Sequence, residues 1–444
     1  MKNKPFLSAA LCAVLSISLI AADDLYAQPG YVPSAENIAS REEFASARFG
    51  IFIHWGIYSM VGHGEWVMQN EDIDYREYPR LASGFYPSNF DAGSWARAIK
   101  ASGARYVTIT SRHHDGFSMW DSDASAYNVV DATPFGRDVI GELADACREQ
   151  GIRLHFYYSH LDWGRTDYPR GRTGKGTGRP EGTDDWRHYM DFVNAQLTEL
   201  LTRYGNIGAI WFDGVWDQDA FPREDQPALW NLYEQYQLIH SLQPGCLVGN
   251  NHHLLPFEGE DIQIFERDIP GRNEFGLSGQ DISSLPLETC QTMNHSWGYR
   301  ITDNDYKSAN DLIRYLVQTA GKGANLLLNV GPRPDGTLPE EALDRLEAIG
   351  KWLAEYGESI YGTEGGFAEE QPWGVRTRKG DTIYVHLLED VPTLELPYDK
   401  VGEVTTWDGT PLKVKRVKGG GVRFDVPARP DGCVDQIIKV VGAR

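Results

Sequence analysis

The chain has 444 residues, and its 63 acidic side chains against 42 basic ones give a formal net charge of −21 at pH 7. Hydrophobic residues make up 41 % and charged residues 24 %, which excludes a mainly disordered chain. The negative charge argues against binding to nucleic acid or to an anionic membrane surface, because both require clustered lysine and arginine. The length allows two or three domains, or one large barrel with an appendage.

Residues 1–28 predict a secretory signal peptide. Two lysines precede an apolar stretch over residues 6–22, and Ala27 is the small residue at the expected cleavage site. A membrane anchor is the weaker alternative, because the stretch barely reaches the ~20 apolar residues that a span needs and two aspartates follow it. We therefore expect a secreted or periplasmic protein whose mature chain does not insert into a membrane.

Eight short β-branched or aromatic runs recur along the next 300 residues. They are 50–55, 105–111, 153–159, 209–213, 246–250, 261–266, 288–293 and 325–330. Near-continuous apolarity is typical of parallel strands buried on both faces, and eight is the count of a (β/α)8 barrel. Several intervals carry the apolar spacing of helices, namely 137–150, 186–204, 309–320 and 340–356.

The barrel is expected to be irregular late in its course. Residues 251–260 are too few for an ordinary crossover helix, and residues 267–286 lack a regular pattern. We therefore predict a somewhat irregular TIM barrel over residues 29–362. Short strands separated by turn residues then predict a small antiparallel β-sandwich over residues 363–444.

Four scattered cysteines remain after the predicted signal peptide. They are Cys147, Cys246, Cys290 and Cys433, with no CxxC spacing among them. This pattern favours buried thiols over a zinc site or a disulfide framework.

Polar residues follow many of the predicted strands, and the carboxyl ends of barrel strands form the active site in this architecture. They are His54, His113, His114, Tyr157, Tyr158, Asp213, Asn250 and Glu266. Any single one can be a structural residue, but so many consecutive polar strand ends indicate a functional site. The high aromatic content, 12 % of the chain, suits either a cleft that stacks on sugars or simple core packing.

Two of these strand ends carry carboxylates. Asp213 closes the apolar run 210–213 and Glu266 closes the run 262–266, two strands later. Glycoside hydrolysis needs such a pair, one as nucleophile or stabiliser and one as proton donor. The alternative for Asp213 alone is a cap on the following turn.

No metal site is predicted, and no other cofactor. His113 and His114 are adjacent, so on a continuing strand they would point to opposite faces and could not share one ion. No HExxH motif is present, nor are the glycine patterns of serine hydrolases or dehydrogenases. Hydrogen bonding to sugar hydroxyls is the favoured interpretation of the two histidines.

Five motifs resemble those of glycoside hydrolase family 29, the α-L-fucosidases. They are FGIFIHWGIYS at 49–59, HHDGF at 113–117, WFDG at 211–214, SWGY at 296–299 and LLLNVGP at 326–332. The resemblance implies a retaining mechanism through a covalent glycosyl-aspartate, without a metal. It also implies that the substrates are fucosylated glycans, from which terminal α-linked L-fucose is released.

The resemblance further implies roles for individual residues. Asp213 is the expected nucleophile and Glu266 the expected acid/base, with Glu288 as an alternative that more plausibly supports the site. The residues expected to hold the sugar are His54, Glu65, Trp66, His113, His114, Tyr158 (less plausibly Tyr157), Trp211, His252 and Trp297. Many family members have arginine at the position of His252, which leaves a related sugar such as α-L-galactose as an alternative. A barrel that binds glycans without hydrolysing them is the other alternative.

Overall fold

The computed structural model describes residues 30–169, 171–180, 185–220, 222 and 225–443. The predicted signal peptide lies outside these residues. Within them, no helix is long and apolar enough to cross a membrane.

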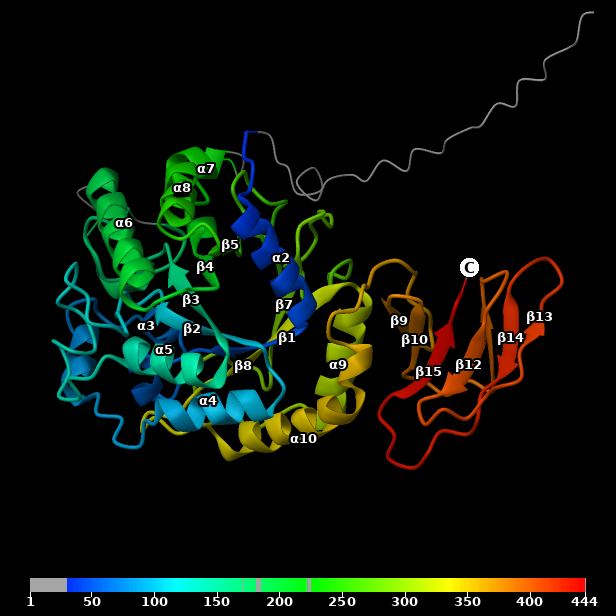
Figure 1. The fold of residues 1–444 in the computed structure, drawn as a ribbon. Coiled ribbons are helices and arrows are strands. Elements are labelled where there is room, and N and C mark those ends of the chain that lie inside the picture. The colour runs from blue at the N-terminus through cyan, green and yellow to red at the C-terminus, as the bar shows by residue number, and fades with distance from the viewer. Residues whose placement is uncertain (1–29, 170, 181–184, 221, 223–224, 444) are drawn as a thin grey trace, which may run out of the picture.

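The first part of the chain forms the predicted barrel (Figure 1). Its eight strands are all parallel, in the order β5-β4-β3-β2-β1-β8-β7-β6. They are β1 Phe49–Ile53, β2 Tyr106–Arg112, β3 Arg153–Ser159, β4 Ala209–Asp213, β5 Leu247–Asn250, β6 Gln263–Glu266, β7 Leu287–Thr292 and β8 Ala324–Val330. Almost every strand residue is buried, as expected for strands covered on both faces.

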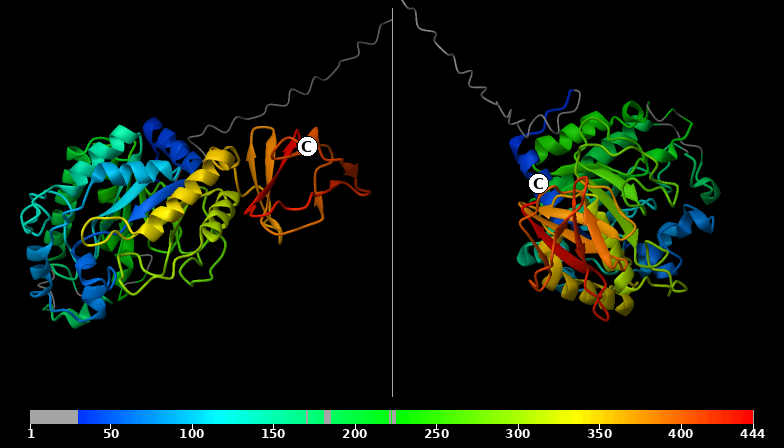
Figure 2. Two further views of the ribbon diagram at one scale, coloured as in Figure 1. Left: turned by 90° about the horizontal axis from the view of Figure 1, so that it is seen from below. Right: turned by 90° about the vertical axis from the view of Figure 1, so that its right-hand side faces the viewer.

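Helices cover the outside of this sheet (Figures 1 and 2). They are α2 Ala35–Ala47, α3 Val67–Asn70, α4 Ala92–Ala101, α5 Val139–Gln150, α6 Trp186–Arg203, α7 Gln226–Leu229, α8 Leu232–Leu242, α9 Ala309–Gly321 and α10 Glu340–Tyr356, with short 3-10 turns η1 Ile57–Val61, η2 Tyr78–Gly84, η3 Lys175–Thr177, η4 Val215–Asp217 and η6 Gly357–Ser359. Helix α9 has the predicted apolar spacing, which places Leu312, Leu316 and Val317 on one inward, buried face. Its start is fixed by a capping box between Ser308 and Asp311.

The expected irregularity lies between β5 and β7, where the described chain forms no crossover helix. Strands β5 and β6 form no regular ladder: Gly249 of β5 bridges to Ile262, the residue before β6, and the Asp261 and Ile262 N–H groups donate to the Val248 carbonyl. The buried Asp261 carboxylate completes this seam, because it accepts a hydrogen bond from the Val248 backbone N–H (2.7 Å) and pairs with Arg41 of α2 (2.5 Å). The barrel is therefore nearly closed, with its weakest pairing beside Glu266.

Two antiparallel sheets follow, as predicted, and share one apolar core. Their orders are β12-β15-β10-β9 and β11-β14-β13, from β9 Gly374–Lys379, β10 Thr382–Leu387, β11 Thr393–Leu396, β12 Glu403–Thr406, β13 Lys415–Arg416, β14 Val422–Asp425 and β15 Gln436–Val441. Strand β9 was not among the predicted strands. It packs against α9, where Gly321 leaves room for Val375 (Figure 1).

The cysteines follow the prediction of free thiols. Cys147, Cys246 and Cys290 are buried and Cys433 is half-buried, and all four are unpaired.

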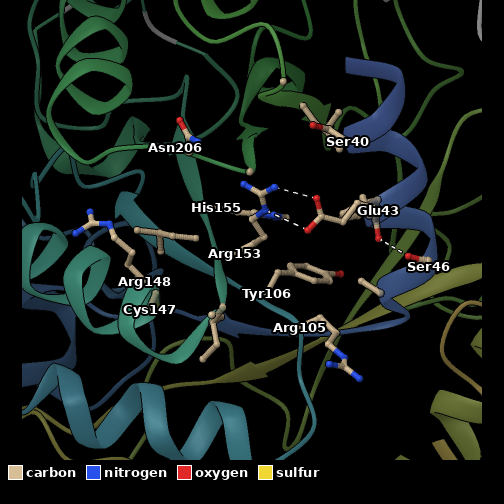
Figure 3. A pocket seen from close by; sticks show the side chains of 18 of the residues that line it. Ser40, Glu43, Ser46, Arg105, Tyr106, Cys147, Arg148, Arg153, His155 and Asn206 are labelled. Atoms are coloured by element: carbon tan, nitrogen blue, oxygen red, sulfur yellow. Dashed lines mark hydrogen bonds and ion pairs between the residues drawn. The ribbon is translucent and has the colours of Figure 1, made fainter. Parts of the chain in front are cut away.

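A cavity lies at each end of the barrel. The one at the amino-terminal ends of the strands measures about 770 Å³, and its rim carries the ion pair between Arg153 and Glu43 (Figure 3). The stacked rings of Tyr106 and His155, with centroids 4.7 Å apart, form part of its lining. The other cavity, of about 1130 Å³, lies at the carboxyl ends and is lined by most of the predicted site residues.

Candidate active site

Asp213 is the last residue of β4 and lies in the wall of the carboxyl-end cavity. The chain turns sharply at Gly214, whose φ is 95° and whose position leaves no room for a side chain beside the Leu161 backbone. This turn brings the Trp216 indole back to the carboxylate. Asp213 Oδ1 accepts hydrogen bonds from Trp216 Nε1 and the Gly214 N–H, both at 2.8 Å, and Oδ2 accepts one from the Tyr157 hydroxyl at 2.9 Å.

The electrostatic surroundings of Asp213 favour a partly protonated carboxyl. Burial, and after it the negative charge of Glu266, raise the pKa of Asp213 to about 7, although the hydrogen bonds from Trp216 and Tyr157 act in the opposite direction. His114 Nε2 lies 3.7 Å from Oδ2, and burial lowers the pKa of that imidazole well below its usual range. The histidine is therefore neutral and does not offset the charge of Asp213.

Glu266, the last residue of β6, lies across the same cavity and is half-buried. Asn251 connects the two acids: its Nδ2 donates to Glu266 Oε2 at 2.9 Å and lies 3.5 Å from Asp213 Oδ1. The two carboxylate oxygens are thus no further apart than the sum of these distances. That sum is below the ~6.5 Å at which the spacing of inverting glycosidases begins.

Glu288, the alternative acid, lies elsewhere. It is buried inside the barrel and is not part of the cavity lining. Its Oε2 accepts from the Tyr106 hydroxyl at 2.5 Å and its Oε1 from Trp211 Nε1 at 2.9 Å, and burial raises its pKa to about 7. With both oxygens held by protein donors, Glu288 supports the Trp211 ring and does not face the cavity.

All four of the predicted histidines lie in the cavity wall, and three of them, His54, His113 and His114, are neutral. Strand β2 ends at Arg112, so alternation stops there and both His113 and His114 reach the cavity, with ring centroids 4.1 Å apart. Burial lowers the pKa of His113 well below its usual range and that of His54 to about 3. These rings are therefore neutral hydrogen-bonding groups, which suits an uncharged sugar.

The tautomer of His54 follows from its neighbour. The Asn329 amide donates through Nδ2 to the Trp297 carbonyl (2.7 Å), so its Oδ1, 2.6 Å from His54 Nδ1, is the acceptor. His54 Nδ1 must then carry the proton. Its Nε2 is left as an acceptor for a sugar hydroxyl.

The aromatic residues of the wall come from several elements. The rings of Trp66 and Trp216 are nearly parallel, with centroids 6.0 Å apart, and the Trp297 ring lies 5.2 Å from that of His54. Trp66, Trp211 and Trp297 all line the cavity, as the sequence predicted.

The prediction for Tyr158 is wrong, and Tyr157 takes its place. Side chains alternate along a strand, and β3 pairs with β4 so that Tyr157 lies beside Trp211, on the inside of the barrel. Tyr158 points the other way, where its hydroxyl donates to Gln196 of α6 at 2.8 Å.

Two other predicted sugar-binding residues have their polar atoms occupied. His252 lies in the cavity wall, but its Nδ1 accepts from the Leu254 N–H (3.0 Å), so its Nε2 carries the proton and faces the Glu260 carboxylate (3.0 Å). Glu65 is buried outside the lining and accepts from the Gly298 N–H at 2.7 Å, with burial raising its pKa. Glu65 thus anchors the segment that carries Trp297.

The sequence reasoning missed Asn251 and Trp216. Asn250 was singled out at the end of its strand, but its amide Nδ2 donates to the Tyr236 hydroxyl (2.8 Å) and the next residue reaches the carboxylates instead. The signal for Trp216 was its position three residues after Asp213, beyond a glycine turn. Among the described residues, no group of three His, Cys, Asp or Glu side chains is arranged to hold a metal ion.

The chain is similar to known proteins over most of its length. The family model described as Alpha-L-fucosidase matches residues 18–358. The chain belongs to the α-L-fucosidase family. An α-L-fucosidase of Branchiostoma floridae is 32 % identical over 443 residues, covering 90 % of this chain and 92 % of its own.

Solved structures of the family share the fold. Alpha-L-fucosidase isoenzyme 1 from Paenibacillus thiaminolyticus superimposes with a TM-score of 0.80 at 33 % identity, covering 92 % of this chain and 100 % of that one. A family 29 α-L-fucosidase from Bacteroides thetaiotaomicron, solved as a trapped covalent intermediate with 2-fluoro-fucosyl fluoride, gives 0.79 at 28 % identity, with coverage of 90 % and 95 %.

Proposed function

We propose that this family member is a retaining exo-α-L-fucosidase that releases terminal α-linked L-fucose from fucosylated glycans. The observation that carries the proposal is the pair Asp213 and Glu266, which contact one Asn251 amide in a cavity lined by neutral histidines and tryptophans. The trapped covalent intermediate of the Bacteroides relative supports the retaining course. Nothing in the comparisons favours a glycan-binding barrel without activity or an α-L-galactosidase.

In the first step, Asp213 attacks the anomeric carbon of fucose. Its Oδ2 has one hydrogen-bond donor whereas Oδ1 has two at 2.8 Å, so Oδ2 is the freer oxygen for the attack. Glu266 gives its proton to the glycosidic oxygen as the bond from that oxygen to C1 breaks. The products are a fucosyl-aspartate ester, a Glu266 carboxylate and the free aglycone alcohol.

In the second step, Glu266 acts as the base. It takes a proton from a water molecule, whose oxygen attacks C1 and displaces the Asp213 carboxylate. Two inversions at C1 restore the original configuration. The position of Asn251 between the two acids allows it to hold Glu266 on the aglycone side throughout both steps.

The wall residues are expected to hold the sugar in distinct ways. His54 Nε2 accepts a hydrogen bond from a fucose hydroxyl, while His113 and His114 supply further neutral partners. Trp211 and Trp297 offer ring surfaces to the C–H and methyl face of the sugar. A charged group at these positions would gain nothing from a neutral ligand and would cost desolvation energy.

Hydrolysis of an aryl α-L-fucoside, followed by NMR, tests the function. α-L-Fucose must appear first, before mutarotation.

Asp213→Ala should abolish turnover, without azide restoring any retained product. Glu266→Ala should slow poor leaving groups far more than good ones, with partial rescue by azide. Glu288→Gln serves as the matched control, because azide should not rescue it. First release of the β-anomer, or full activity of Glu266→Ala on a natural oligosaccharide, would refute the proposal.

Export belongs to the same proposal. The support is the basic, apolar and small-residue pattern of residues 1–28, which lie before the described chain. Amino-terminal sequencing of the protein recovered from the periplasm or the medium should show a chain that begins next to Ala27. An intact Met1 in that fraction would contradict it.

A further inference from the structure

The residues beside Glu266 determine what can follow the fucose. Under the proposed function, on which this inference rests, the Glu266 proton goes to the oxygen that joins fucose to its aglycone, so the aglycone must lie on the Glu266 side of the cavity. Two helix-free segments form that side, residues 251–262 after β5 and residues 267–286 after β6. Their side chains therefore form the aglycone subsite.

Exposed apolar side chains gather in these two segments. Leu255 and Leu277 line the cavity and are 51 % and 39 % exposed, and Leu254, Pro256 and Phe257 line the same wall. Phe275 and Ile282 are also exposed, so four of the eleven large exposed hydrophobic residues in the described chain lie between 255 and 282. Such a concentration beside a site is typical of a surface that a ligand covers.

The polar side chains of the same wall are largely used by the chain itself. The Asn273 Oδ1 accepts from the Ser278 N–H at 3.0 Å, and the Gln280 Nε2 donates to the Ile264 carbonyl at 3.0 Å. These amides fix the course of the 267–286 segment. Beside these amides, Leu255 and Leu277 add exposed apolar surface that a ligand can cover.

Charge at the mouth of the cavity disfavours an acidic aglycone. Asp219 and Asp281 both line the cavity. Two guanidinium groups lie against rings of this region: that of Arg172, which lines the cavity, over Trp216 at 4.9 Å, and that of Arg267 over Trp297 at 4.9 Å. With Asp213 and Glu266 in the same cavity, carboxylates still outnumber them. The net charge of −21 adds a long-range repulsion of anions.

We propose that the aglycone subsite of this protein takes an apolar group next to the fucosidic bond, such as an alkyl chain or an aromatic ring, in preference to an acidic sugar. The occupant is the aglycone itself, because the leucine wall is continuous with the cavity that holds Asp213 and Glu266.

A series of alkyl α-L-fucosides tests this, because methyl, butyl and octyl aglycones differ mainly in apolar area. We expect kcat/KM to rise at least about tenfold from methyl to octyl. The double variant Leu255→Ser/Leu277→Ser should reduce the octyl-to-methyl ratio to below about threefold. Leu343→Ser is the matched control: it removes an exposed leucine from α10, outside the cavity lining and outside both aglycone segments, and should leave both values unchanged.

Three outcomes would overturn the inference. They are equal kcat/KM for methyl and octyl fucosides, an octyl-to-methyl ratio that the double variant leaves intact, and faster release of fucose from sialylated or sulfated glycans than from their neutral counterparts. Failure of the proposed function is distinguishable, because an activated aryl α-L-fucoside would then remain uncleaved. Circular dichroism of each variant identifies a loss of folding.

Discussion

Asp213 must be ionised to attack the sugar, but its surroundings raise its pKa. Attack on the sugar requires the carboxylate, whereas burial, together with the charge of Glu266, raises the pKa of Asp213 to about 7. The three hydrogen bonds from Trp216, Tyr157 and Gly214 offset part of that increase, so that a fraction of Asp213 is ionised at neutral pH and the fraction grows above it.

The pH dependence of the free enzyme should report this balance. For an activated aryl fucoside, kcat/KM should fall as the pH drops below about 7, because protonated Asp213 cannot attack. Glu266→Gln removes a charge that raises the Asp213 pKa, so the acidic limb should move to lower pH. Rate measurements between pH 4 and 9 check this, and an unmoved limb would contradict the proximity of the two acids.

The adjacent tyrosines of β3 provide a matched pair. Tyr157→Phe deletes a donor to Asp213, which should lower kcat/KM by roughly ten- to a hundredfold and move the acidic limb to higher pH. Tyr158→Phe removes a hydroxyl that bonds to Gln196, so it should reduce stability and leave the kinetic constants unchanged. Equal kinetic effects of the two substitutions would show that Tyr157 is wrongly assigned to the inside of the barrel.

At the level of single residues, the sequence identified the residues at strand ends and missed those that depend on register or loop course. Asp213 and Glu266 could be predicted because each closes an apolar run. The choice between Tyr157 and Tyr158 required the pairing of β3 with β4. Asn251 lies in a segment without periodicity, so nothing in the pattern distinguished it from Asn250.

Strand β7 contributes a residue that stabilises the floor of the site. Glu288 connects Tyr106 of β2 with Trp211 of β4 across the barrel interior, and Trp211 in turn lies in the cavity wall. A buried carboxylate with two donors is well satisfied, but any replacement with fewer acceptors leaves one donor unpaired.

Glu288→Gln should therefore loosen Trp211. Glutamine offers a single acceptor oxygen for two donors, so we expect a loss of about 1–3 kcal/mol in the free energy of unfolding. We also expect a rise in KM that exceeds the change in kcat, since Trp211 is proposed to offer its ring to the sugar in both steps. Thermal unfolding and steady-state kinetics measure the two effects. A rate that azide restores would instead make Glu288 the acid/base.

The arrangement of elements could largely be predicted. All eight parallel strands were expected from the sequence, most of them from an apolar run, although β7, LETCQT, contains none. The missing crossover helices between β5 and β7 followed from segment length and composition. Strand β9 was missed because its sequence, GVRTRK, carries three basic residues and little apolar alternation. Its place in the sheet comes from pairing with β10.

The barrel and the antiparallel β-sandwich meet through a close contact between α9 and β9. A side chain at Gly321 would lie 2.5 Å from the Val375 Cβ, so the junction tolerates no Cβ at this helix position. Arg314 of α9 adds a hydrogen bond to the Leu388 carbonyl at 2.5 Å. The junction lies away from the carboxyl-end cavity, none of whose lining residues belongs to it.

Gly321→Ala should lower the stability of the full chain by about 1–3 kcal/mol through overpacking, although alanine itself favours a helix. The double variant Gly321→Ala/Val375→Ala should recover part of the loss, because the second substitution removes the two methyl groups at 2.6 and 3.0 Å, while the Cβ at 2.5 Å stays. Thermal unfolding of the full-length variants provides the measurement, with aryl fucoside kinetics expected to stay constant. Additive losses in the double variant would place the strain elsewhere.

At the nearly open seam between β5 and β6, the residues that hold the barrel together are separate from those that face the aglycone. Because no crossover helix follows β5 or β6, the segments 251–260 and 267–286 can change in length or composition without removing a helix from the outer layer or the seam residues Asp261 and Ile262. The seam itself is held by the ion pair between Asp261 and Arg41, neither of which lines the carboxyl-end cavity. Aglycone preference is thereby free to diverge among relatives while the fucose-binding wall and the barrel stay the same.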